Sequence, residues 1–429
     1  MKLAIIGTGY VGLVTGTCFA EVGNQVTCVD CDEKKVRLLQ DGGMPIYEPG
    51  LEALVKKNIA AGRLTFTSDT KAAVDRSDII FIAVPTPAMP DGSVDLSFIE
   101  AVAREIATGL TSYKIVVDKS TVPVNTGEKV AETIKRYCKS KVEFDVVSNP
   151  EFLREGFAVD DFLKPDRVVV GVSSQRAVPA LKQLYEPFNA PIIVTDLNSA
   201  ELIKHAANSF LALKISYINA ISIICEASGA NVQEVANGIG MDSRIGRRFL
   251  DASLGFGGSC FPKDLSAFIK ISEQLGYDFR LLREVQKINV DQMDHFVKKI
   301  TDTLWVLKDK KIGVLGLAFK KNTDDIRMSP AIELCQRLQK DGAHLRVFDP
   351  QAMAKSRTAL PAATFCNDMN EVAEGCDALV IATEWDEFKE LDLEKVRRDM
   401  THPIVFDGRN MFEPDAMERL GFIYKSIGR

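Results

Sequence analysis

The stretch that decides the fold is KLAII at residues 2–6, followed directly by GTGYVG at Gly7–Gly12. An apolar stretch continues through Val22, and a second short apolar run, QVTCVD, ends at Asp30. The order is strand, glycine turn, helix, strand and acid, which is typical of a dinucleotide-binding βαβ unit. This opening therefore predicts an α/β protein built on a doubly wound sheet.

The three glycines of the turn have separate tasks. Gly7 permits the tight turn, Gly9 lets the backbone approach a pyrophosphate, and Gly12 lets the helix pack closely on the strand. The helix N-terminus offers N–H groups and a partial positive charge to the phosphates. Asp30 lies where a carboxylate hydrogen-bonds a ribose 2′-hydroxyl and repels a 2′-phosphate, so we expect NAD rather than NADP.

Further strand-like runs alternate with helical segments through the first half of the chain. Such alternation predicts a parallel sheet, whose functional loops lie at the carboxyl ends of its strands. Three candidate loops are VPTP after Val84, KSTVP after Asp118 and NPEFLREG after Ser148. The runs themselves are DIIFIAV at 78–84, KIVVD at 114–118, DVVS at 145–148, RVVVGV at 167–172 and PIIVTD at 191–196.

A long stretch without proline follows and predicts a single helix from Ser199 to Ser228. At 1.5 Å per residue this helix is about 45 Å long. Asn198, with Glu201 three residues later, resembles a capping box, and Gly229 fits a helix stop. A helix this long and this apolar usually spans two domains or packs in an oligomer interface.

The pattern of the first half returns after Leu307. KKIGVLGLAFK at 310–320 resembles KLAIIGTGYVG, and HLRVFDP, CDALVIAT and PIVFDGRN follow in the matching order. Phe319 stands where the third glycine would be, so we expect this copy to bind a nucleotide attached to a sugar instead of a dinucleotide. The predicted fold is thus α/β, with two Rossmann-like doubly wound domains joined by a long central helix. Its expected domains are 1–197, which binds NAD, the central helical region 198–300, and the C-terminal domain 301–429.

Composition narrows the function classes. The net charge of −6 gives no electrostatic footprint for nucleic acid. We find no apolar run of about 18 or more residues and expect no membrane association. Nine scattered cysteines do not resemble a disulfide framework, which favours a reducing cytoplasm. Cys28 and Cys31 have C-x-x-C spacing, but with only four histidines in the chain we expect no metal site.

A lone thiol in GFGGSCFPKD, Gly255–Asp264, is the most specific chemical signal. Oxidising an alcohol does not require a thiol. A thiolate becomes useful when the product aldehyde is oxidised again, because it adds to the aldehyde and the adduct can lose a second hydride. Lys263 favours the thiolate, and Asp264 is placed to relay a proton or orient a water. The alternative is a structural cysteine; beside a dinucleotide fingerprint we favour Cys260 as the nucleophile.

Other polar residues add to this constellation. Lys204 and Asn208 share one helix face at i and i+4, where a charge and an amide donor suit an oxyanion; the alternative is a solvated helix surface. Glu151 is a candidate base for thioester hydrolysis, although a carboxylate after a proline is often only a helix-start residue. Thr121 either donates to a water or substrate oxygen or is a turn residue.

Seven motifs occur in a fixed order along nearly the whole chain: GTGYVG, YEPGL, STVPV, NPEFLREG, ELIKHAANSFLALKIS, GFGGSCFPKD and LAFKKNTDDIRMSPA. With them the chain strongly resembles the UDP-glucose/GDP-mannose dehydrogenase family. The resemblance implies an NAD domain, a central dimerisation region with the catalytic loop and a UDP-sugar domain, in a homodimer or higher homo-oligomer. It also implies a four-electron reaction. Two NAD convert the C6 alcohol of UDP-glucose to the carboxylate of UDP-glucuronate, through a cysteine thiohemiacetal and thioester.

The resemblance also assigns residues. It makes Cys260 the nucleophile, Lys204 and Asn208 oxyanion donors, Asp264 a support for the hydrolytic water, and Glu151 and Thr121 acid/base or water-positioning groups. Which of Glu151, Asp264 or Lys204 is the base of the first hydride step stays open. The implied cofactor contacts are Gly7, Gly9, Tyr10, Val11, Gly12, Asp30, Lys35, Thr86, Ser120, Thr121, Glu155, Lys263 and Arg327. The implied substrate contacts are Glu151, Phe152, Leu153, Lys204, Asn208, Arg244, Phe249, Leu250, Ser253, Gly257, Phe319, Lys320 and Arg409, with Arg244 reaching the partner's substrate.

Three other interpretations remain open from the sequence. The same chemistry could act on GDP-mannose or a UDP-N-acetylhexosamine. A two-electron hydroxyacid or 6-phosphogluconate-like dehydrogenase shares the layout but needs no thiol. A non-catalytic nucleotide-sugar sensor would keep the fold, although the intact set of Cys260, Lys204, Asn208 and Asp264 argues against it.

Overall fold

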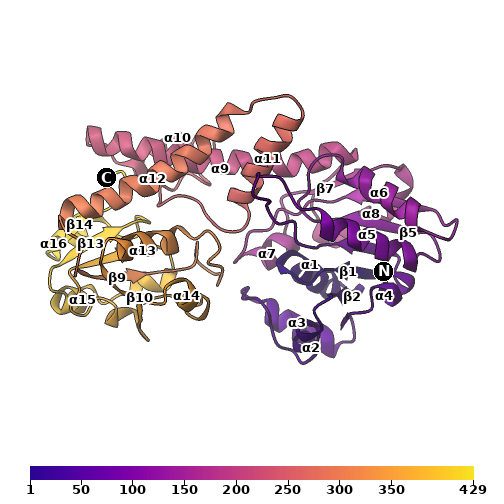
Figure 1. Cartoon of the computed structure of the whole chain (residues 1–429), viewed down its shortest axis with the longest axis horizontal. Helices are drawn as coiled ribbons and strands as arrows, with labels where there is room; N and C mark the ends of the chain where they lie inside the picture. Colours follow the sequence, from indigo (N-terminus) through magenta and orange to yellow (C-terminus); the bar gives the residue numbers. More distant parts are fainter. The chain divides into compact units, whose positions relative to one another are not determined.

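The structure is a computed structural model that describes residues 1–429 (Figure 1). The chain divides into two compact units. The N-terminal unit consists of Met1–Ala207 and Ser266–Tyr277, and the C-terminal unit consists of Asn208–Leu265 and Asp278–Arg429. The division falls within the long central helix, so each unit contains part of it.

The N-terminal unit is built on an eight-stranded sheet in the order β3-β2-β1-β4-β5-β6-β7-β8. Its first six strands have the doubly wound order of a dinucleotide-binding fold. The predicted parallel sheet is confirmed except at one pair, since β6 and β7 are antiparallel. The connection between them, residues 149–167, contains only the six-residue α7 and lacks the longer crossover helix of a βαβ unit. The strands are β1 Lys2–Ile6, β2 Gln25–Val29, β3 Leu64–Thr67, β4 Ile79–Ile82, β5 Lys114–Asp118, β6 Phe144–Ser148, β7 Val168–Val172 and β8 Ile192–Thr195.

Helices cover both faces of this sheet (Figure 1). Because side chains alternate along a strand, Leu3 and Ile5 of β1 face one core with α1, α3 and α7, while Ala4 and Ile6 face another with α4, α5 and α6. The bounds are α1 Tyr10–Glu21, α2 Glu33–Gln40, α3 Leu51–Ala60, α4 Thr70–Arg76, α5 Ser97–Gly109, α6 Thr126–Tyr137, α7 Ala158–Leu163 and α8 Val178–Tyr185, with 3-10 turns η1 Gln175–Ala177 and η2 Glu186–Phe188.

The predicted long helix is present as α9, Leu197–Ser228, and it ends before Gly229 at φ +74°. The predicted capping box is wrong. Asp196 caps the helix by accepting from the Ser199 N–H at 2.8 Å. Asn198 and Glu201 instead accept from the backbone at the start of α6, where Glu201 Oε1 lies 2.7 Å from the Gly127 nitrogen. A distant helix with unpaired N–H groups thus takes the side chains that local spacing assigned to α9.

By length and composition α9 is apolar enough to cross a bilayer, with a mean hydropathy of 1.5 in its most apolar window, contrary to the sequence expectation. One such helix is weak support for a membrane span, since core helices of globular proteins meet the same criterion. The sequence interpretation looked for an uninterrupted apolar run. In α9, single charged residues such as Lys204, Lys214 and Glu226 separate apolar segments, and the mean hydropathy stays high in spite of them.

The C-terminal unit contains a second, six-stranded parallel sheet in the order β11-β10-β9-β12-β13-β14. This is the doubly wound order again, as the repeated sequence pattern predicts. The strands are β9 Lys311–Leu315, β10 His344–Phe348, β11 Thr364–Phe365, β12 Ala378–Ile381, β13 Ile404–Asp407 and β14 Ile423–Lys425. The helices are α10 Val232–Gly240, α11 Phe261–Gln274 (shared with the N-terminal unit), α12 Arg280–Leu304, α13 Pro330–Lys340, α14 Met353–Ala359, α15 Leu393–Asp399 and α16 Pro414–Arg419, with 3-10 turns η3 Met369–Glu371 and η4 Asp386–Glu390.

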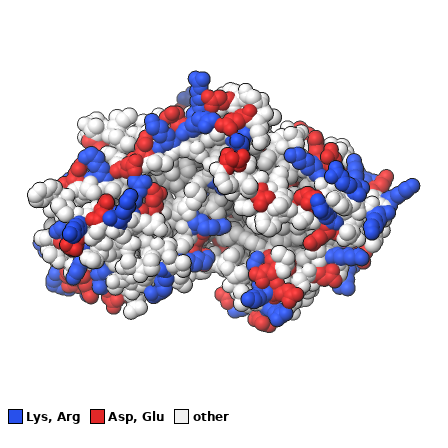
Figure 2. Space-filling view, viewed as in Figure 1, with Lys and Arg blue, Asp and Glu red and all other residues white.

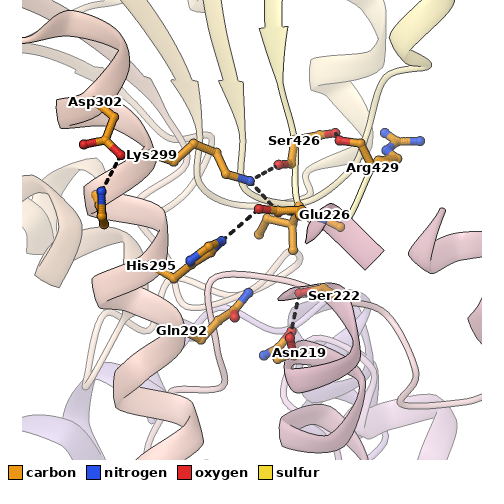
Figure 3. Close-up of polar contacts among 12 residues, drawn as sticks. Asn219, Ser222, Glu226, Gln292, His295, Lys299, Asp302, Ser426 and Arg429 are labelled. Atoms are coloured by element: carbon orange, nitrogen blue, oxygen red, sulfur yellow. Dashed lines mark hydrogen bonds and ion pairs between the residues drawn. The ribbon is translucent and has the colours of Figure 1, made fainter. Parts of the chain in front are cut away.

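Glu226 ties the end of α9 to α12 and to the last residues of the chain (Figure 3). Its carboxylate accepts from Lys299 Nζ at 2.5 Å, from His295 Nε2 at 2.8 Å and from the Gly428 N–H at 2.8 Å. Burial alone raises the pKa of Glu226, but these hydrogen bonds outweigh it and hold the pKa below its ordinary value. The central helix is therefore fastened to α12 and to the segment after β14 by an ionised carboxylate.

Charged side chains of both signs are interspersed over the visible surface of each unit (Figure 2). This mixture agrees with a net charge of −6 distributed over 53 basic and 59 acidic residues.

Candidate active site

The glycine turn in the N-terminal unit has the geometry that a dinucleotide requires. Gly7 has φ +101°, and a side chain there would overlap the carbonyl oxygen of Ala83. A Cβ at Gly12 would overlap the Gly7 oxygen, so helix α1 packs closely on the turn. A Cβ at Gly9 would meet nothing within 4 Å, and no side chain caps α1. The turn thus leaves open space in front of a helix N-terminus, which fits a pyrophosphate.

Asp30 directly follows β2 and contacts the glycine turn. Its carboxylate accepts from the Thr8 N–H at 2.9 Å and from Lys35 Nζ at 2.8 Å. Burial raises the pKa of Asp30, but the hydrogen bonds from Lys35 and Thr8 outweigh it and keep the pKa below its ordinary value. Asp30 is therefore an ionised acceptor, as a ribose hydroxyl requires, and the structure brings Lys35 to it.

The segment after β5 is anchored from several elements. Thr86 Oγ1 donates to the Thr121 carbonyl at 2.9 Å, and Ser120 Oγ donates to the Val84 carbonyl at 3.0 Å. His205 Nε2 lies 2.8 Å from the carbonyl oxygen of Val122. The Thr86 and Ser120 hydroxyls, predicted to contact cofactor, thus hold the loop that contains Thr121.

Glu151 and Lys204 form a buried ion pair. Glu151 Oε1 lies 2.9 Å from Lys204 Nζ, and both side chains are less than 10% exposed. The second oxygen of Glu151 accepts from the Leu153 N–H at 2.5 Å. Phe152 lies beside the pair, with Lys204 Nζ 5.5 Å and the Arg167 guanidinium 3.6 Å from its ring centroid. The pair joins two predicted catalytic residues that are 53 positions apart in sequence.

Glu155 is buried in the same loop. Tyr10 holds this loop beside the glycine turn, because its hydroxyl accepts from the Gly156 N–H at 2.8 Å and donates to Glu48. Glu48 also accepts from the Gly156 and Ala158 N–H groups, both at 2.7 Å. The Tyr10 hydroxyl therefore holds the loop after β6 beside the glycine turn. Val11 lies in the first turn of α1.

The second group of predicted catalytic residues lies in the C-terminal unit. Cys260 is exposed and immediately precedes α11. Its carbonyl accepts from the Asp264 N–H at 2.8 Å, so the chain makes its first helical turn here. Asp264 is buried and accepts from Asn208 Nδ2 at 2.7 Å and from Lys263 Nζ at 2.6 Å. The structure pairs Lys263 with Asp264, and the predicted roles of Lys263 beside the thiol and the cofactor stay predictions.

The loop before Cys260 is held against the C-terminal Rossmann-like domain. A side chain at Gly257 would overlap the Met328 carbonyl oxygen, and a Cβ at Gly258 would lie 2.7 Å from the Phe319 ring. Arg409 fixes the Phe319 segment by donating to the carbonyls of Ala382 and Phe319 at 2.8 and 3.1 Å. The predicted substrate residues Gly257, Phe319 and Arg409 therefore belong to one packed region.

The remaining predicted residues lie either in the interior or toward the surface. Leu250 and Ser253 are buried, and Ser253 is held through its backbone by Asn219 and Gln292. Phe249 has φ +65°. The others extend toward the surface: Lys320 lies over the Phe319 ring, Arg327 pairs with Asp325 at 2.6 Å, and Arg244 pairs with Asp242 at 2.6 Å with its side chain 86% exposed.

Sequence reasoning missed several residues beside this machinery, above all Lys119 and His205. Lys119 directly follows the strand-like run KIVVD at 114–118, where a charged residue beside a buried strand was a usable signal. His205 directly follows Lys204 in the quoted helix motif. Asp118 and Glu201 are also buried near this loop, and burial raises the pKa of Glu201 to about 7.

Sequence profiles of one family match most of the chain. The NAD binding domain of the UDP-glucose/GDP-mannose dehydrogenase family matches residues 1–189, the central domain matches 198–291, and the UDP binding domain matches 313–414. The chain belongs to the UDP-glucose/GDP-mannose dehydrogenase family. The resemblance inferred from the seven motifs is thereby confirmed, and the protein is an NAD-dependent dehydrogenase.

Individual family members are similar over their full length. The UDP-glucose 6-dehydrogenase TuaD of Bacillus subtilis is 49% identical over 100% of this chain and 93% of its own. The structure of a UDP-glucose dehydrogenase from Pyrobaculum islandicum has a TM-score of 0.92 and 40% identity, covering 99% of this chain and 96% of that one. A UDP-D-ManNAc dehydrogenase structure from Pyrococcus horikoshii has a TM-score of 0.86 at 29% identity, with 100% of this chain and 99% of that one covered.

The residues present fit the NAD that the family uses. Open space at Gly9, the uncapped start of α1 and the ionised Asp30 provide a phosphate cradle and a ribose acceptor in one unit. The fold prediction of two Rossmann-like domains with a long central helix is confirmed as well.

Proposed function

We propose that the protein oxidises UDP-glucose at C6 to UDP-glucuronate and consumes two NAD in each turnover. The identity of 49% to a UDP-glucose 6-dehydrogenase, against 29% to the UDP-D-ManNAc dehydrogenase, favours glucose as the sugar. The observation on which the covalent mechanism depends is the exposed Cys260 at the start of α11, four residues before the buried Asp264. A thiol at a helix N-terminus is favoured in its nucleophilic thiolate form.

Bound NAD supplies a hydride acceptor for each of the two oxidations. After the first oxidation the Cys260 sulfur adds to the aldehyde carbon, and the carbonyl oxygen becomes an oxyanion for which Lys204 and Asn208 are the proposed donors. Loss of a second hydride from this thiohemiacetal gives a thioester. Water then breaks the carbon–sulfur bond and yields the carboxylate and the free thiol, with Glu151, Asp264 and Thr121 as the groups that position or activate the water.

The remaining cofactor and substrate residues named from the sequence are proposed in the same roles. In the N-terminal unit they surround the glycine turn and the loops after β4, β5 and β6. In the C-terminal unit they lie on the segment before Cys260 and on the loops after β9 and β13. We also place the protein in the reducing cytoplasm, in agreement with nine free cysteines.

The test of the reaction is the NADH yield per nucleotide sugar. Purified protein with limiting UDP-glucose and excess NAD should form two NADH and one UDP-glucuronate per sugar, because alcohol and aldehyde are oxidised in succession. GDP-mannose and UDP-N-acetylhexosamines are the matched competitors. Turnover confined to one of these would reject UDP-glucose as the substrate, and one NADH per sugar would reject the four-electron reaction.

We further propose that the protein is a homodimer joined through α9. An apolar stripe runs along this helix within the C-terminal unit: Phe210, Leu213, Tyr217, Ala220, Ile224 and Ala227. The spacing alternates three and four residues, which is the seam of a coiled coil, and it is about 26 Å long. Phe210, Tyr217 and Ile224 are 52–60% exposed, more than a large apolar side chain without a partner usually is.

The stripe can be tested with the double variant Phe210→Asp/Tyr217→Asp. We expect it to sediment as a monomer, since two carboxylates would be buried without partners in the seam. Activity should fall with it, because the exposed Arg244 is proposed to reach the partner's substrate. Leu38→Asp, an exposed apolar position on α2, is the control and should leave the mass unchanged. A double variant that remains dimeric would show that another surface joins the subunits.

A further inference from the structure

Lys119 is a buried cation that the proposed chemistry does not use. It follows β5 directly, and its residue is 4% exposed. Its ammonium group donates to Asn149 Oδ1 at 3.1 Å, a neutral acceptor, and lies 5.7 Å from the Phe162 ring centroid. No carboxylate is within ion-pair distance. Burying an ammonium group without a counterion is costly, so its presence calls for an explanation.

The surroundings of Lys119 hold it in place. The Asn149 amide donates to the Val169 carbonyl at 2.7 Å, and the Tyr185 hydroxyl donates to the same Asn149 oxygen as Lys119 does. The backbone of Lys119 donates to the Ile82 carbonyl at 2.9 Å. Its position between β4 and β6, at the carboxyl ends of the strands, is the edge where Rossmann-like folds place functional groups.

The charged groups that act on Lys119 are those of the predicted catalytic pair. Burial lowers the pKa of Lys119 to about 8; the negative charge of Glu151 opposes this shift, and the positive charge of Lys204 adds to it. Tyr185, on α8, is neutral because burial raises its pKa. Asn149 lies two residues before Glu151, so one short segment contacts Lys119 and contains Glu151.

We propose that Lys119 is a positioning residue of the active site, whose buried ammonium group holds Asn149 and with it the segment that carries Glu151. Lys204 bonds one oxygen of Glu151 but is also proposed to serve a substrate oxyanion. When Lys204 turns to that task, Lys119 remains as the second positive charge in this buried region. The inference rests on the proposed function of Glu151 and Lys204.

If Lys119 is kept for function at a cost in stability, the pH dependence of the free energy of unfolding should show it. Because the folded-state pKa of about 8 is below the ordinary lysine value of 10.5, the buried charge destabilises the protein at pH 7. As pH rises from 8 toward the unfolded value, the folded protein loses this proton first and regains stability. Removing the charge should therefore stabilise the protein at neutral pH and should make no difference at about pH 10.5.

The experiment compares Lys119→Met with wild type and with Lys114→Met. Lys114 is a second buried lysine, at the opposite end of β5, and donates to the Asp75 carbonyl at 2.9 Å. For Lys119→Met we expect a melting temperature about 2–4 °C higher at pH 7. We also expect kcat to fall about tenfold while the KM for NAD stays near the wild-type value, since the segment that carries Glu151 then loses a buried anchor. Lys114→Met should leave kcat unchanged and should not raise the melting temperature.

The inference is overturned if Lys119→Met is less stable than wild type at pH 7 and retains the wild-type kcat, because Lys119 would then have a structural role only. Lys119→Arg, which keeps the charge and a donor, should retain most of the wild-type kcat. If wild type itself oxidises no nucleotide sugar, the proposed function fails instead. The dependence of the melting temperature on pH would still decide whether Lys119 is buried as a cation.

Discussion

Replacing Cys260 by serine is expected to lower UDP-glucuronate formation by about 10³-fold or more, because a serine hydroxyl is a much weaker nucleophile than a cysteine thiolate at neutral pH. The change removes the atom that would retain the aldehyde for its second oxidation. The rest of the arrangement should survive, since the Cys260 carbonyl, and not its sulfur, accepts the hydrogen bond that begins α11. Binding of UDP-glucose should change little.

The measurement is the product distribution under excess NAD, followed by mass spectrometry of the sugar and of the intact protein. Wild type incubated with substrate should show a covalent adduct after rapid quenching, and the Cys260→Ser variant should show none. Cys138→Ser is the control, because Cys138 is also a partly exposed thiol and bonds only to Ser140 in the described contacts. Sustained acid production by Cys260→Ser would contradict the covalent mechanism and favour a route through a hydrated aldehyde.

The Gly9→Ala substitution is expected to weaken NAD binding about tenfold or more without lowering the melting temperature. Gly9 has φ −69° and ψ −170°, which alanine adopts readily. A Cβ there meets no protein atom within 4 Å. The added methyl group would instead occupy the space in which a pyrophosphate approaches the start of α1, and a loss of about 1.4 kcal/mol corresponds to a factor of ten in affinity.

Gly12→Ala provides the contrast within the same turn. Its Cβ would overlap the Gly7 carbonyl oxygen, which is backbone and cannot rotate away. We expect this variant to be destabilised by about 1–3 kcal/mol or more, as overpacked cores are, and to lose NAD binding together with stability. Calorimetric titration with NAD and thermal unfolding of both variants separate the two effects. If Gly9→Ala bound NAD as wild type does, the cofactor would not approach this turn as closely as proposed.

Local patterns in the sequence were sufficient for the two sheets. The alternation of apolar runs and helical segments, with GTGYVG at the first turn, predicts the doubly wound order that both units have. The pattern could not reveal that β7 runs against β6, because strand direction depends on where the connecting chain crosses the sheet. It also misplaced the cap of α9, since Asn198 and Glu201 bond to a helix some 70 residues away.

For the site, the sequence by itself supplied the residue types that we propose for the chemistry: a thiol, a lysine and amide one helical turn apart, and two acids. Only the tertiary structure decided their partners. It joined Glu151 to Lys204 and Asn208 to Asp264, turned Lys263 toward Asp264, and left Lys119 buried with a neutral acceptor. The physical reason is that backbone preference and hydrophobic periodicity act over a few residues. Pairing between charged groups is set by burial, which a chain acquires only when distant segments pack together.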